Sequence, residues 1–135
     1  MELVEAERFP GRDRAGLEAF LRYCRERARE DGEAVIASIS LRVKYIDPLA
    51  VLESIFEPDA HHCYIERPEA DEAVAAAEAV VSREYSGSGR FEEAERFSQA
   101  VFSRTIATGD IDLPFAGPHC FAGFTFAPEV EPEEP

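Results

Sequence analysis

Histidine and cysteine side chains are concentrated in two short runs of the chain. The first run is His61, His62 and Cys63, and the second is His119 and Cys120. Zinc binds imidazole and thiolate groups, and the two runs would supply enough of them if their strands were neighbours. The spacing matches no zinc-finger pattern, however, and successive residues of a strand point to opposite faces. We therefore expect structural roles for these side chains and predict no metal site.

Carboxylates and a single lysine are the other groups whose types suggest chemistry. Asp110 and Asp112 are the nearest candidates for magnesium ligands, but two aspartates beside a glycine more often belong to turns and caps. Lys44 is the only lysine, and it would need a lowered pKa to act as a general base. Its position at a strand end favours a solvated side chain. We predict no catalytic and no cofactor-binding residue.

Two further motifs have structural explanations that are favoured over functional ones. GSGR at residues 87–90 precedes an expected helix and could hold an anion on the helix amides, but it lacks the spacing of a phosphate loop. Phe121, Phe124 and Phe126 resemble a stacking platform, but no basic residues accompany them, so they are expected to be core. No nucleophile elbow is present to support acyl transfer.

Composition limits the class of protein. The 135 residues suit one domain, and the formal net charge of −14 argues against a nucleic-acid partner, which would need clustered Lys and Arg. The N-terminal sequence has no basic segment followed by an apolar one, and no apolar stretch is long enough to span a membrane. The odd count of three cysteines suits reduced thiols. These features predict a cytoplasmic chain without disulfides.

The elements that must position these residues begin with a helix and a strand. Apolar residues recur at helical spacing between residues 13 and 30, namely Leu17, Phe20, Leu21, Cys24 and Ala28. Residues 34–43 alternate with a period of two, and the face predicted to be buried carries Val35, Ala37, Ile39, Leu41 and Val43.

The middle of the chain contains two further helices and a strand. Asp47 and Pro48 are typical of a helix start, and the helix continues through Phe56. Residues 61–67 are expected to form a strand. Residues 91–106 are expected to form a helix that buries Ala94, Phe97, Val101 and Phe102, with Ser88 as a cap and Gly109 closing it.

Two segments are harder to interpret. Residues 69–85 are alanine-rich and favour a helix by propensity, whereas residues 80–85 suit a strand equally well, and both interpretations stay open. Residues 114–126 are expected to form one strand or a tight pair of strands. The tail at residues 127–135 holds four glutamates and three prolines and is expected to be disordered.

Four of these segments together carry a resemblance. They are SISLRVKYIDPLAVLESI at 38–55, HHCYIE at 61–66, GSGRFEEAERF at 87–97 and GDIDLPFAGPHCFAGFTF at 109–126, of which DLPFAGPH at 112–119 is the strongest. In this order they resemble the N-terminal part of isochorismate synthases, within the chorismate-binding enzyme family. The resemblance implies an α+β fold, a partial chorismate-binding-enzyme-like fold that we expect to consist mainly of antiparallel strands with amphipathic helices.

The resemblance also implies a reaction and where its groups reside. Isochorismate synthases convert chorismate to isochorismate with Mg²⁺, a lysine base and a glutamic acid, all carried by a later segment of the family pattern. None of these groups is transferred to a residue of this chain, and Mg²⁺ is expected only for the complete enzyme. Chorismate is accordingly expected as a ligand only through a catalytic half.

Two functional hypotheses follow. In the first, residues 1–126 are the N-terminal segment of an isochorismate synthase-like protein of quinone or siderophore and salicylate-type biosynthesis, inactive by itself. In the second, the chain is a stand-alone binding or regulatory module that pairs with a separate catalytic chain. A segment of a larger domain should leave strand edges and apolar side chains uncovered, which promotes association with itself or a partner chain, whereas a module should cover them.

Overall fold

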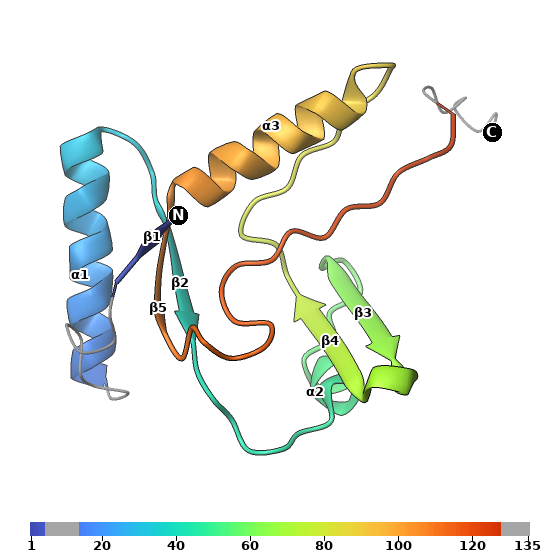
Figure 1. The fold of residues 1–135 in the computed structure, drawn as a ribbon, viewed down its shortest axis with the longest axis horizontal. Coiled ribbons are helices and arrows are strands. Elements are labelled where there is room, and N and C mark those ends of the chain that lie inside the picture. The colour runs from blue at the N-terminus through green and yellow to red at the C-terminus, as the bar shows by residue number, and fades with distance from the viewer. Residues whose placement is uncertain (5–13, 128–135) are drawn as a thin grey trace. The chain divides into compact units, whose positions relative to one another are not determined.

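The computed structural model describes residues 1–4 and 14–127 of the chain. Figure 1 shows the order of the elements, which is β1 (Glu2–Leu3), α1 (Arg14–Asp31), β2 (Ile36–Ser40), α2 (Pro48–Ser54), β3 (His62–Arg67), the 3-10 helix η2 (Pro68–Ala70), β4 (Glu72–Ala77), α3 (Arg90–Ser103) and β5 (Thr105–Gly109). The chain divides into two compact units. Unit 1 comprises Met1–Arg42 and Tyr85–Pro135, and unit 2 comprises Val43–Glu84.

A parallel three-stranded sheet forms the centre of unit 1. The strand order is β1-β5-β2, and β5 pairs in parallel with both neighbours, placing Ile36 opposite Thr105 and Ser40 opposite Gly109. The mixture of helices and strands is as expected, but the prediction of mainly antiparallel strands is wrong, because among the strands of the described residues only the β3-β4 pair is antiparallel. Parallel neighbours need long crossover connections: the chain between β2 and β5 carries all of unit 2 and α3, and the chain between β1 and β5 carries these together with α1 and β2.

The core of unit 1 lies between α1 and this sheet. Val4, Phe20, Cys24 and Ile106 form one buried cluster, with Tyr23 and Val35 packed against it. The predicted helix at residues 13–30 is confirmed from Arg14 onward, since Asp13 lies outside the described residues. Fewer side chains of this helix are buried than the sequence pattern predicted, namely Phe20 and Cys24.

Two leucines of α1 show how far the buried stripe differs from the prediction. Leu17 is 43% exposed and Leu21 is 47% exposed, whereas Phe20 and Cys24 of the same helix are buried. The helical period is therefore correct, but the side turned to the sheet is centred on Phe20 and Cys24 rather than on the leucines.

Strand β2 exists where a strand was predicted, but it is shorter and its faces are reversed. Ile36, Ser38 and Ser40 are half-buried, while Ala37 and Ile39 are exposed, so the prediction of the buried face is wrong. On the α1 side, Val35 packs against the core cluster, but Ala37, which lies opposite Ile106, and Ile39 are left exposed; on the other face, Ser40 Oγ accepts from Gly117 N of the segment after β5. Alternation alone gives the two faces of a strand but not which of them is covered.

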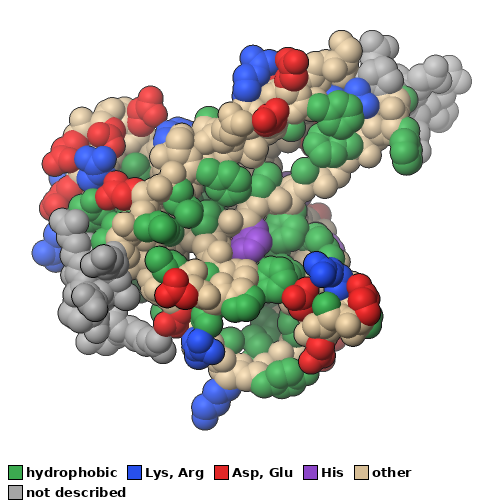
Figure 2. Space-filling view, viewed as in Figure 1, with side chains coloured by type: hydrophobic (Ala, Val, Ile, Leu, Met, Phe, Trp, Pro, Cys, Tyr) green, Lys and Arg blue, Asp and Glu red, His purple; other side chains and the backbone are tan. Residues whose placement is uncertain are grey.

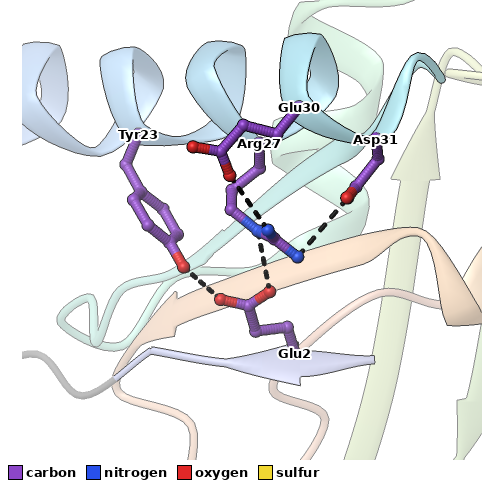
Figure 3. Close-up of polar contacts among 5 residues, drawn as sticks. All are labelled: Glu2, Tyr23, Arg27, Glu30 and Asp31. Atoms are coloured by element: carbon purple, nitrogen blue, oxygen red, sulfur yellow. Dashed lines mark hydrogen bonds and ion pairs between the residues drawn. The ribbon is translucent and has the colours of Figure 1, made fainter.

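A polar cluster fastens β1 to α1 (Figure 3). The Tyr23 hydroxyl donates to one oxygen of Glu2, and the Arg27 guanidinium lies 3.5 Å from the other oxygen. Arg27 also contacts Glu30 at 3.2 Å and Asp31 at 3.4 Å. The Glu30 hydrogen bond, followed by the charges of Asp31 and Glu2, raises the pKa of Arg27. Such charged side chains gather over α1 in Figure 2.

Helix α3 begins and ends earlier than predicted. Gly89 is its N-cap and no side-chain hydrogen bond caps it, so the expectation that Ser88 caps the helix is wrong. The helix ends at Ser103, and Ile106 and Gly109 belong to β5 instead. The prediction extended too far because Ile106 continues the apolar spacing of α3 although the chain has already entered the central strand.

The structure of unit 2 decides between the helix and the strand interpretations of residues 69–85. β3 and β4 form an antiparallel pair with His62 opposite Ala77 and Arg67 opposite Glu72, and η2 connects them. The strand predicted at residues 61–67 is confirmed. Residues 69–85 thus contain no α-helix, and apart from the end of η2 their regular structure is a strand in the alanine-rich first half rather than at residues 80–85. Pairing with β3 outweighs the helix propensity of alanine.

The start of α2 agrees with its prediction and gives a test of unit 2. The Asp47 carboxylate accepts hydrogen bonds from Leu49 N at 2.9 Å and Ala50 N at 3.4 Å. We expect Asp47→Ala to lower the free energy of unfolding by about 1 kcal/mol because two helix amides lose their acceptor. Urea unfolding followed by circular dichroism measures this loss. Asp59→Ala is the control, and an equal loss there would contradict the capping role.

Candidate functional site

The carboxyl ends of β2 and β5 meet at one edge of the parallel sheet, where ligands bind in many open α/β sheets. Residues 110–119, here called the strand-end loop, follow β5 at this edge. Asp110 Oδ2 accepts from Arg42 N at 2.7 Å, and Asp110 N donates to Ser40 O at 2.7 Å. Gly117 N donates to Ser40 Oγ at 2.8 Å. The loop is therefore tied to the end of β2 at two of its positions.

Gly109 makes this junction possible. Its φ of +98° is a backbone conformation that L side chains rarely adopt, and a Cβ built on it would lie 2.1 Å from Ser40 O. No side chain fits at that distance from a backbone carbonyl. The turn from β5 into the strand-end loop thus requires glycine at this position.

The loop itself is a succession of turns. Leu113 N donates to Asp110 O at 3.3 Å, and Ala116 N donates to Leu113 O at 3.1 Å. Phe115 has a φ of +58°. In the described residues, the segment 114–126 contains no strand, so the prediction of one or two strands there is wrong. Two prolines, which cannot donate to a ladder, and the positive φ values oppose extended pairing.

His119 lies on the surface of the loop, among aromatic rings. Its Nδ1 lies 3.0 Å from Gly117 O, and its ring centroid lies 6.2 Å from that of Phe121 and 6.5 Å from that of Phe115. The imidazole is therefore held by a local hydrogen bond and ring contacts, while Cys120 beside it is exposed and free.

The phenylalanines that follow the loop are exposed. Phe121 is 41% exposed, Phe124 is 52% exposed and Phe126 is fully exposed, so the expectation that they are core is wrong. Phe124 contacts Phe91 of α3 with ring centroids 4.9 Å apart, and Phe91 is itself half exposed. Hydrophobic side chains gather at this end of α3 in Figure 2. Unit 1 has an apolar surface here rather than a second core.

The first histidine run lies in unit 2. His61 and His62 line a pocket of about 240 Å³ between α2 and the β3-β4 pair, together with Glu57 and Glu78, and the His62 ring stands edge-on to Phe56 at 4.7 Å. This volume is below the range of roughly 300 to 1,000 Å³ that ligand pockets usually occupy.

Metal ligation finds no support among the residues that the structure describes. No group of three or more His, Cys, Asp or Glu side chains in residues 1–4 and 14–127 is arranged to hold a metal ion. Asp110 binds backbone amide groups, Asp112 is exposed, and Lys44 is exposed in the segment between β2 and α2. The described residues do not fit a magnesium site, and we derive no reaction step from one.

The cysteines are all free thiols. Cys24 is part of the core, and burial raises the pKa of its thiol, which favours the unreactive neutral form. Cys63 is half-buried in β3.

Sequence reasoning missed Arg90. It is only 8% exposed, and its guanidinium donates to Gly87 O at 3.1 Å, Thr125 O at 3.2 Å and Phe126 O at 3.4 Å. These bonds hold the segment after the strand-end loop against the start of α3. The GSGR motif drew attention for its amide groups, whereas burial of its arginine side chain has no signature in the sequence.

Comparison with protein families decides the broader assignment. A family model described as chorismate binding enzyme matches residues 20–135. The chain belongs to the chorismate binding enzyme family. The match begins within α1 and includes β2 to β5 and the strand-end loop, but not β1, and the resemblance expected from the sequence is confirmed at this level. No curated protein and no solved structure gives a significant match to the chain.

None of the helices in residues 1–4 and 14–127 of this family member is long and apolar enough to cross a membrane.

Proposed function

We propose that this chorismate binding enzyme family member is the N-terminal scaffold of an isochorismate synthase-like enzyme, which converts chorismate to isochorismate. The exposure of the aromatic residues after the strand-end loop carries the proposal, because a self-contained module would cover them. Residues 1–126 would form the scaffold. The segment that covers this surface would supply the catalytic groups.

The chemistry of the described residues supports the same division. Lys44 is exposed, Asp110 Oδ2 accepts from Arg42 N, and no group of three or more His, Cys, Asp or Glu side chains in the described residues is arranged to hold a metal ion. By resemblance, the lysine base, the glutamic acid and the Mg²⁺ would come with the catalytic half. The product would serve menaquinone, phylloquinone or siderophore and salicylate-type biosynthesis in the cytoplasm.

The test is to supply the purified chain with chorismate and Mg²⁺. We expect no isochorismate after incubation, and we expect the two-dimensional amide NMR spectrum to be unchanged by chorismate, because the scaffold lacks the groups that hold and convert the substrate. The same assay with a complete isochorismate synthase is the positive control.

Two results would count against this proposal. Turnover by the chain alone would show that its own residues perform the reaction. Saturable shifts of resolved peaks without turnover would favour the second hypothesis, a stand-alone module that binds chorismate and pairs with a separate catalytic chain.

A further inference from the structure

The outer edge of β3 carries unpaired backbone groups. Glu78 N donates to His61 O at 2.7 Å, so these two opposite residues form a hydrogen-bonded pair that continues the β3-β4 ladder. Such pairs alternate along antiparallel strands, so the backbone groups of His62, Tyr64 and Glu66 point away from β4. The sheet has two strands (Figure 1), and in the described residues no backbone hydrogen bond satisfies these outward groups. This edge can therefore accept another strand.

The ends of β3 limit the register of such a strand. The ladder begins at His61, and Pro68, which has no N–H to donate, directly follows Arg67. A second copy of β3 related by a two-fold axis would run antiparallel to the first. Because only alternate residues offer outward groups, the register that uses the whole segment 61–67 is centred on Tyr64.

This register places a histidine opposite a carboxylate. His62 would lie opposite Glu66 of the second copy, once on each side of the axis, and both side chains are exposed. The Tyr64 hydroxyl donates to Glu66 Oε2 at 3.2 Å and so holds this carboxylate beside the axis. Within one chain, His62 and Glu66 lie opposite Ala77 and Ala73. The attraction between imidazole and carboxylate would therefore arise only between two copies.

The remaining cross-strand pairs are compatible with this register. Cys63 would lie opposite Ile65, which is 50% exposed and would gain an apolar neighbour. His61 would lie opposite Arg67, whose guanidinium is already paired with Glu72 of its own chain at 3.6 Å. This ion pair offsets the charge that Arg67 presents to the histidine.

The outer edge of β4 does not fit a second copy in the same way. Its outward groups belong to Ala73, Ala75 and Ala77, and the register of equal length is centred on Ala75. That register would place Glu72 opposite Glu78 of the second copy. Like charges directly opposite one another destabilise a ladder, so the charges favour the edge of β3 over that of β4.

We propose that the outer edge of β3 pairs with β3 of a second copy of this chain across a two-fold axis. The product is a four-stranded antiparallel sheet with the strand order β4-β3-β3-β4. A single strand pair is smaller than the interface of about 1,600 Å² that stable complexes bury, so we expect a weak dimer. The inference does not rest on the proposed function, because it uses only residues of unit 2.

Sedimentation equilibrium of the full chain, over roughly 10 µM to 1 mM protein, measures the association. We expect the mass to rise from that of one chain towards that of two and no higher, because a two-fold interface occupies the edge completely.

Amide hydrogen exchange, followed by NMR at the lowest and highest of these concentrations, locates the surface. Exchange should become several-fold slower at His62, Tyr64 and Glu66 at the higher concentration. The amides of Cys63 and Ile65 already bond to β4, so their exchange should be unaffected.

Two charge changes test the register. Glu66→Arg removes the carboxylate opposite His62, and His62→Glu places two carboxylates opposite each other. We expect each to weaken dimerisation by roughly tenfold, because the two-fold axis repeats the effect. His62→Glu combined with Glu66→Arg restores opposite charges and should dimerise at least as tightly as the unaltered chain. Glu69→Arg makes the same charge change beyond the strand and should leave dimerisation unchanged.

The proposal is overturned if the chain stays monomeric over this range, or if it associates without slower exchange at His62, Tyr64 and Glu66. It is also overturned if the combined variant dimerises as weakly as the single ones. Growth beyond two chains would indicate pairing of β3 with β4 of the next copy and would overturn it as well.

Discussion

Gly109→Ala is expected to lower the free energy of unfolding by roughly 4 kcal/mol or more, which for a chain of this size is enough to populate the unfolded state. The added Cβ would lie 2.1 Å from Ser40 O, a backbone atom that is part of the β2-β5 pairing. Relief would require β5 to move away from β2 at the edge where the strand-end loop begins. The positive φ of Gly109 adds strain of order 1 kcal/mol or more.

Gly32→Ala is the matched control for this prediction. Gly32 also has a positive φ, +69°, but a Cβ there would meet nothing within 4 Å. It should therefore cost only about 1 kcal/mol, the strain of the backbone alone. Urea unfolding of the two variants separates close contact from backbone strain, and equal losses would show that Ser40 does not lie against Gly109 as described.

The second large effect is expected for Phe20→Ala, at about 3 to 5 kcal/mol. Phe20 is 1% exposed and belongs to the cluster with Val4, Cys24 and Ile106 that joins α1 to the sheet. Removing its ring leaves a cavity between the helix and β5. The loss is measured as a lower urea midpoint with an unchanged slope.

Leu21→Ala provides the comparison, because Leu21 is the next residue of α1 and is 47% exposed. Its loss should stay below about 1 kcal/mol. A larger loss at Leu21 than at Phe20 would mean that the leucine side of α1, and not the side of Phe20 and Cys24, faces the sheet.

Elements that are determined by residues close to one another in the sequence could be predicted. The helix over Arg14–Asp31 follows from apolar spacing, and the start of α2 follows from Asp47, whose side chain bonds to amides two and three residues ahead. The more buried face of β2 could not be predicted, because it depends on what packs against each face: the α1 core reaches Val35 but leaves Ala37 and Ile39 exposed, whereas Gly117 N donates to Ser40 Oγ on the other face. That choice is tertiary, and the alternating pattern is the same for both outcomes.

The central strand β5 is a second element that could not be predicted from the sequence. Thr105, Ile106, Ala107 and Thr108 are all buried, so the strand has no alternation to reveal it, and it follows α3 after one residue. Continuous burial over a short run is compatible with a helix end as well as with a strand. The long-range pairing with β1 and β2 decides the structure.

The candidate site was predicted only in part. The DLPFAGPH run lies within the residues that the family model matches, but its turns and the exposure of Phe121, Phe124 and Phe126 were not foreseen. Aromatic residues are expected in a core by their type alone. Whether a core forms depends on what lies against them.

The place of β5 in the sheet constrains when the sheet can form during synthesis. β1 and β2 are made first but do not pair with each other, since β5 lies between them and its last residue is Gly109. Until β5 has been made, none of the strand pairs described in unit 1 can exist, whereas the β3-β4 pair of unit 2 needs only neighbouring residues. The hairpin should thus fold ahead of the sheet, and the closing of the long β2 to β5 connection should limit the folding rate of unit 1.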